Sequence, residues 1–81
     1  MSNIDYDLDK SDKRLQINYQ SLNRLHTISV SGTLSEDGNT FFANSEAIDN
    51  CNDLSLTEKT GLKTHVTRES SSDDKTEIVF V

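Results

Sequence analysis

Hydrophobic and polar residues alternate in several stretches of the chain, which is the pattern of β-strands with one buried face. The first stretch interleaves three apolar residues with three aspartates: Ile4, Asp5, Tyr6, Asp7, Leu8 and Asp9. A strand here would bury the apolar side chains and expose the carboxylates. Because aspartate is a poor strand former, a frayed segment over residues 1–12 is the alternative.

Two longer stretches predict a hairpin. Residues 15–20 and residues 27–34 each carry apolar side chains at every second position, and β-branched residues are dense in both. The short connection at residues 21–24 favours two antiparallel strands joined by a turn.

Asp37-Gly38 is the clearest turn signal in the sequence, because glycine readily adopts the positive φ of a tight hairpin turn. Residues 40–44 then return as a third strand. Phe41 and Phe42 are adjacent, so on a strand they point to opposite faces. One is expected in the core, and the other is expected to be covered by a helix, a partner chain or a ligand.

The period of the pattern changes after residue 44. Ser45 is a favourable N-cap for a short helix of about two turns. Ser55 and Glu58 match a capping box, and a second helical turn there would end at Gly61. The residues expected on one stripe of the first helix are Ala47, Ile48, Cys51 and Leu54.

The last third of the chain reads as two further strands. Leu62, Thr64 and Val66 alternate with polar residues, which predicts a strand over residues 62–67. The serine- and aspartate-rich residues 70–74 predict a loop, and the apolar end of the chain predicts a terminal strand over residues 76–81.

Together these elements predict an α+β fold. We expect a small antiparallel sheet of four to five strands, with one short helix packed on one face. Eighty-one residues allow one domain with one core, so residues 1–81 are expected to form a single domain.

The charge narrows the classes of partner. Fourteen acidic residues against eight basic ones give a net charge of −6. This balance disfavours direct binding to nucleic acid or to a negatively charged membrane, and favours a positively charged partner. The single cysteine permits no intramolecular disulfide, and neither a signal peptide nor an apolar membrane span is expected. The predicted location is the reducing cytoplasm.

One acidic segment partly matches a calcium-binding loop. The aspartates at positions 5, 7 and 9 have the spacing of the first three EF-hand ligands. Lys10 stands where that loop requires glycine, however, and Gln16 stands where a glutamate should close it. The sequence therefore predicts a solvated acidic strand face at this segment.

No catalytic motif is assembled elsewhere. Cys51, His26 and His65 lack the spacing of a zinc site, and no glycine-rich phosphate loop or nucleophile motif is present. We therefore expect neither a metal nor a cofactor, and the chain is predicted not to be an enzyme.

The distribution of acidic residues is the most informative remaining feature. Several clusters fall on predicted turns or on outward strand positions, where they would imitate nucleic-acid phosphates or act only as solubilising charge. An exposed aromatic residue would anchor a partner, with Tyr6 as a further candidate. The predicted binding residues are Asp5, Asp7, Asp9, Asp12, Glu36, Asp37, Asp73 and Asp74, together with Phe41 or Phe42.

Two functions remain in view. The first is an inhibitor or adaptor that engages a basic, nucleic-acid-binding surface of a larger protein. In size, acidity and lack of catalytic motifs, the chain resembles small inhibitory proteins of viruses and mobile elements, including those that block nucleases. The alternative is a self-associating structural or accessory protein, in which the terminal strand and the surplus phenylalanine are buried in a homodimer.

Overall fold

The computed structural model describes residues 3–21, 23–72 and 75–81. The strands are β1 (Asn3–Asp9), β2 (Arg14–Ser21), β3 (Arg24–Leu34), β4 (Thr40–Ala43) and β5 (Glu77–Phe80), and the helices are α1 (Glu46–Asp49) and α2 (Leu56–Ser72). Within the described residues the fold is α+β, as expected from the sequence.

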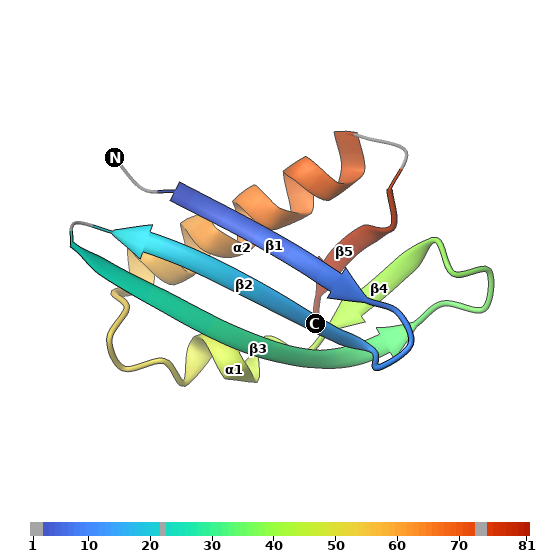
Figure 1. The fold of residues 1–81 in the computed structure, drawn as a ribbon, viewed down its shortest axis with the longest axis horizontal. Coiled ribbons are helices and arrows are strands. Elements are labelled where there is room, and N and C mark those ends of the chain that lie inside the picture. Colours follow the sequence, from blue (N-terminus) through green and yellow to red (C-terminus); the bar gives the residue numbers. More distant parts are fainter. Residues whose placement is uncertain (1–2, 22, 73–74) are drawn as a thin grey trace.

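The described strands form one sheet in the order β1-β2-β3-β4-β5 (Figure 1). The first four strands pair with their neighbours antiparallel, but β4 and β5 run parallel. The expectation of a purely antiparallel sheet is therefore wrong. The reason lies between these strands, because α2 carries the chain back along the sheet, and a crossover of that kind lets the next strand enter in the same direction.

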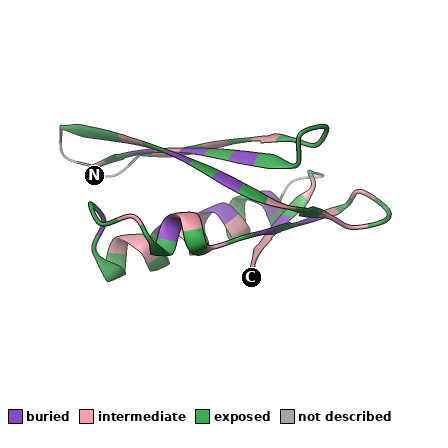
Figure 2. Ribbon diagram, turned by 90° about the horizontal axis from the view of Figure 1, so that it is seen from below, coloured by how far each residue is buried: buried purple, intermediate pink, exposed green. Residues whose placement is uncertain are grey.

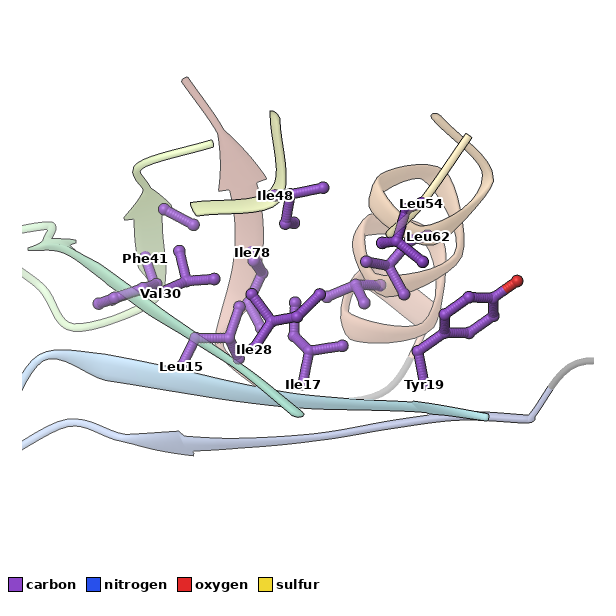
Figure 3. Packing of buried hydrophobic residues seen from close by; sticks show 12 residues of the cluster. Leu15, Ile17, Tyr19, Ile28, Val30, Phe41, Ile48, Leu54, Leu62 and Ile78 are labelled. Carbon is purple, nitrogen blue, oxygen red and sulfur yellow. The ribbon is translucent and has the colours of Figure 1, made fainter. Parts of the chain in front are cut away.

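The sheet is curled (Figure 2). In this view β1, β2 and β3 form one layer, the helices lie beneath it, and β3 crosses to the helix side, where β4 and β5 lie. The buried residues face the space between the two layers, and Figure 3 shows their side chains meeting there. The buried apolar residues are Leu15, Ile17, Tyr19, Ile28, Val30, Phe41, Ala43, Ile48, Leu54, Leu62, Val66 and Ile78.

Alternation correctly identified the inward positions of the strands. In β1, the apolar residues are half-buried and the three aspartates are exposed. In β4, Phe41 is fully buried, whereas 38% of Phe42 is exposed. The prediction that these adjacent phenylalanines point to opposite faces is therefore confirmed.

The C-terminal third differs from the expectation. Residues 62–67 belong to α2 instead of forming a strand, and α2 continues through Gly61, where the sequence suggested an end. In a helix Leu62 and Val66 are four residues apart, so they share one face, and both are buried in the core. Burial of this pair stabilises the helix despite its threonine- and serine-rich composition, which has low helix propensity. Residues 70–72, expected in a loop, form its last turn.

Candidate functional site

The acidic residues of β1 form a row on the outer face of the sheet. Asp5, Asp7 and Asp9 are all exposed, and they lie opposite Asn18, Gln16 and Arg14 of β2. Residues two apart on a strand are about 7 Å apart and point the same way. Pairing with β2 therefore holds three carboxylates in a straight, evenly spaced line, which we call the acidic row.

Hydrogen bonds give two members of the acidic row a local structural role as well. Asp9 Oδ1 accepts the backbone N–H groups of Ser11 and Asp12, at 3.0 and 3.2 Å, and so shapes the turn that follows β1. Asp5 Oδ1 accepts the N–H of Tyr6 at 3.0 Å. Both interactions use one carboxylate oxygen at an exposed position, so a cationic partner can still approach the other oxygen.

The outer face beside the acidic row carries few charges. Apart from Arg14, the outward residues of β2 and β3 level with the row are amides and hydroxyls, with Thr27 donating to Asn18 at 3.2 Å. Arg14 lies opposite Asp9, and its Nη1 donates to Ser29 at 3.0 Å. The negative charge of this face is thus concentrated on the strand at its edge, and Arg14 weakens it at the Asp9 end.

A second acidic group lies in the turn between β3 and β4. Glu36 and Asp37 are exposed. Asp37 Oδ1 accepts the Ser35 hydroxyl at 2.7 Å and the Asn39 N–H at 2.9 Å. Both hydrogen bonds lower the pKa of the Asp37 carboxyl from its usual value, and the bond from the Ser35 hydroxyl has the larger effect. Asp37 therefore organises the turn that Asp37-Gly38 predicted, in which Gly38 has the positive φ of 76°.

The two acidic turns share one end of the molecule. The turn after β1, which contains the exposed Asp12, and the turn between β3 and β4 both lie at the right of Figure 1 and of Figure 2. Asp73 and Asp74, also predicted as binding residues, lie outside the described residues.

The aromatic candidates are not brought together with the acidic row. Phe41 is in the core, and Tyr6 is half-buried on the inner side of β1. Phe42 lies on the outer face of β4, opposite Thr33 of β3 and Val79 of β5. Two strands separate β1 from β4, so the acidic row and Phe42 occupy different parts of the sheet surface.

The two edge strands of the sheet have different neighbours. On β5, the backbone N–H of Ile78 donates to the buried hydroxyl of Ser70 in α2 at 2.9 Å, so the helix covers this edge at Ile78. On β1, the described residues supply a strand neighbour on the β2 side alone. Sequence reasoning missed Ser70 because residues 70–74 were read as a loop, although its position eight residues after Leu62 is a sign of the same helical face.

A groove of about 440 Å³ opens beside β1. Tyr6 and Leu8 line it from one side, and Ile78 of β5 and Thr76, the residue before β5, line it from the other. The charged residues Asp7, Lys10 and Lys75 also line the groove. No sequence pattern pointed to it, because it forms where the curl of the sheet brings its first and last strands near each other.

The histidines and the cysteine each have contacts of their own. His26 stacks on Tyr19, with ring centroids 5.9 Å apart, and His65 Nε2 lies 3.8 Å from a carboxylate oxygen of Glu69. Cys51 is half-buried against the core. Among residues 3–21, 23–72 and 75–81, no group of three or more His, Cys, Asp and Glu side chains is arranged to hold a metal ion. In the same part of the chain, neither helix has the length and apolar character needed to cross a membrane.

Comparison with protein-family models, with curated proteins and with solved structures finds no match to this chain.

Proposed function

We propose that this protein binds another protein, as an inhibitor or adaptor, and that its acidic row engages a basic surface on a larger partner. The observation that carries the proposal is the exposed line of Asp5, Asp7 and Asp9 on a strand at the edge of the sheet. In this proposal the chain itself carries out no reaction, and the partner is a cytoplasmic protein whose basic surface handles nucleic acid.

The rigidity of the acidic row favours binding. Short aspartate side chains on a paired strand lose little conformational entropy when a cation docks against them, unlike long side chains on a mobile loop. Complementary charge also steers the encounter and raises the association rate, which then falls with added salt.

The spacing of its carboxylates limits how closely the acidic row can imitate the phosphates of a nucleic acid. One DNA strand carries a charge about every 3.4 Å along the helix axis, whereas a strand with an acid at every second residue carries one about every 7 Å. The row therefore resembles a thinned phosphate backbone. We expect it to contribute a modest part of the binding energy, and contacts around it to supply the rest.

The test is affinity capture from a lysate of the source cell with three matched baits. The first is the wild-type protein, and the second carries Asp5→Asn, Asp7→Asn and Asp9→Asn. The third carries Glu46→Gln, Glu69→Gln and Glu77→Gln, which changes the net charge equally at exposed positions away from β1. Asparagine retains an acceptor for the turn after β1, so the second bait is expected to fold.

We expect a basic protein to be retained by the wild-type and third baits and to elute between about 0.2 and 0.5 M salt, where screening becomes strong. The second bait should retain less of it and release it at lower salt. Equal retention by the second and third baits would show that the acidic row plays no part, leaving its charges as solubilising groups.

Self-association is the second candidate, and Phe42 is the observation that favours it. This phenylalanine is 38% exposed on the outer face, next to the half-buried Val79. Sedimentation equilibrium at tens of micromolar should then show a dimer for the wild-type protein and a monomer for Phe42→Ser. A wild-type monomer under these conditions would remove this candidate.

A further inference from the structure

The exposed edge of β1 has the geometry of a site for strand addition. An edge strand presents backbone N–H and C=O groups that can pair with another chain. In this protein α2 occupies the β5 edge at Ile78 through Ser70, whereas no described strand lies beyond β1. Within the described part of the molecule, β1 therefore offers an incoming segment the longer edge, with 7 residues against 4 in β5, and that edge carries the acidic row.

The two sides of β1 specify different neighbours. On the outer side an added strand would run beside Asp5 and Asp7, where cross-strand partners of opposite charge are favourable. On the inner side it would extend over the groove beside Tyr6 and Leu8, both half-buried. The charged groups that line this groove are of both signs, Asp7 with Lys10 and Lys75, so the half-buried Tyr6 and Leu8 are the contacts that favour an apolar residue there.

We infer that β1 receives an extended segment of the partner as an additional strand, with basic residues at outward positions and apolar residues at inward positions. This inference rests on the proposed function and specifies how the partner binds. Backbone pairing would supply affinity, and the alternating side chains would supply specificity.

Asp5 already bonds to a backbone donor that an added strand would use. Its carboxylate accepts the N–H of Tyr6 at 3.0 Å, so it covers a backbone donor at the edge of the sheet. A carbonyl of an incoming strand replaces the carboxylate at this donor. The displaced carboxylate then faces a basic side chain of the same segment, so one event forms both a backbone bond and an ion pair.

A second copy of the chain is the wrong occupant for this edge. Antiparallel pairing of β1 with itself about Tyr6 would place Asp5 of each copy opposite Asp7 of the other. Like charges directly opposite each other destabilise a strand pair. The same aspartates that attract a basic strand thus oppose edge-to-edge association of the protein with itself.

The experiment uses two blocked nine-residue peptides of identical composition, one alternating lysine with valine and the other with all lysines grouped. Binding is followed by amide chemical shifts of the ¹⁵N-labelled protein and by hydrogen exchange of the β1 amides. A variant of the protein carries N-methyl Tyr6 and is made by joining synthetic residues 1–50 to residues 51–81 at Cys51. This change removes one edge donor and keeps every side chain.

Strand addition predicts that the alternating peptide binds the wild-type protein about tenfold more tightly than the grouped peptide, and that it slows exchange of the Tyr6 amide. N-methylation should abolish the difference between the peptides. Strand addition would be overturned if both peptides bound equally and the β1 amides were not protected. If that binding were also lost with Asp5→Asn and Asp7→Asn, the role of the acidic row in the proposed function would still stand. Absence of binding by either peptide would overturn both.

Discussion

The Ser70 hydroxyl in α2 accepts a hydrogen bond from the backbone N–H of Ile78 in β5 at 2.9 Å, and it donates to the carbonyl of Thr67 at 3.0 Å. Ser70 is fully buried, and it is the one buried polar residue in the described part of the chain. A single side chain thus satisfies an edge group of β5 that water cannot reach.

Replacing Ser70 by alanine should therefore destabilise the protein by about 1–3 kcal/mol, because the N–H of Ile78 would be left buried without an acceptor. Urea unfolding followed by circular dichroism measures the change. Ser71→Ala is the matched control, since Ser71 is exposed and its hydroxyl donates to Arg68 within the same helix. A change of about 0.5 kcal/mol or less is expected there. Similar losses for both variants would contradict this role of Ser70.

Gly32 should not tolerate a larger side chain. A Cβ built on it would collide with the carbonyl oxygen of Phe42 and would lie 2.6 Å from Cζ of Phe41. Neither the β3–β4 backbone nor the buried ring can move freely, so we expect Gly32→Ala to cost about 3 kcal/mol.

Gly61→Ala provides the opposite case for the same substitution. No heavy atom lies within 4 Å of a Cβ placed at Gly61, which is exposed within α2. Alanine there should stabilise the protein by about 0.5–1 kcal/mol through helix propensity. Thermal unfolding of the two variants should thus shift in opposite directions. A shift of Gly61→Ala to lower temperature would argue against a helix at this position.

Glu58 should contribute to the loss of stability in acid. Its carboxylate accepts the N–H of Ser55 and the hydroxyl of Tyr19, both at 2.9 Å, and these bonds lower its pKa from the usual 4.5. A lowered pKa in the folded state stabilises the protein above the unfolded pKa, and the effect is lost as the pH falls through the folded pKa. Glu58→Gln should therefore flatten the decline in urea midpoint from pH 5 to pH 3.

Two features make that comparison specific. Glutamine at the same position of a capping box can still accept the N–H of Ser55, so the substitution mainly removes the charge. Glu77→Gln removes one carboxylate at an exposed position elsewhere and serves as the control. Identical pH profiles for Glu58→Gln and the wild-type protein would refute a role for this carboxylate in acid stability.

Asp9 should matter for stability through its oxygen and for binding through its charge. Asp9→Ala removes the acceptor of two backbone N–H groups in the turn, which we expect to cost about 1 kcal/mol at an exposed site. Asp9→Asn retains an oxygen and should cost less than half of that. Equal unfolding midpoints for the two variants would show that the turn does not depend on this side chain.

The strand half of the fold was predictable because its signals are local. The alternation in β1 and β2, the connection at residues 21–24 and the Asp37-Gly38 turn each involve neighbours in sequence. The opposite orientations of Phe41 and Phe42 follow from strand geometry alone. Hairpins need no information beyond such segments, so they can be read from one sequence.

The helical half was misread because two periods fit the same residues. Leu62 and Val66 are four apart, which satisfies both a strand with every second residue inward and a helix with one buried face. Gly61 and the many threonines favoured the strand. Burial of these two residues against the sheet favours the helix. Such a contact between distant parts of the chain cannot be read from a short stretch of sequence. The parallel pairing of β5 was missed for the same reason, since it depends on the crossover made by α2.

The parallel pairing of β5 has a consequence for the order of folding. Phe41 pairs with Ile78 across more than thirty intervening residues, whereas the hairpins of β1, β2 and β3 close short connections. Loop-closure entropy makes the longer closure costlier by about 2 kcal/mol. We therefore expect the N-terminal meander to assemble first and β5 to join last. Until then the apolar inner face, including Leu15 and Ile17, stays open to water, and aggregation competes with folding in that interval.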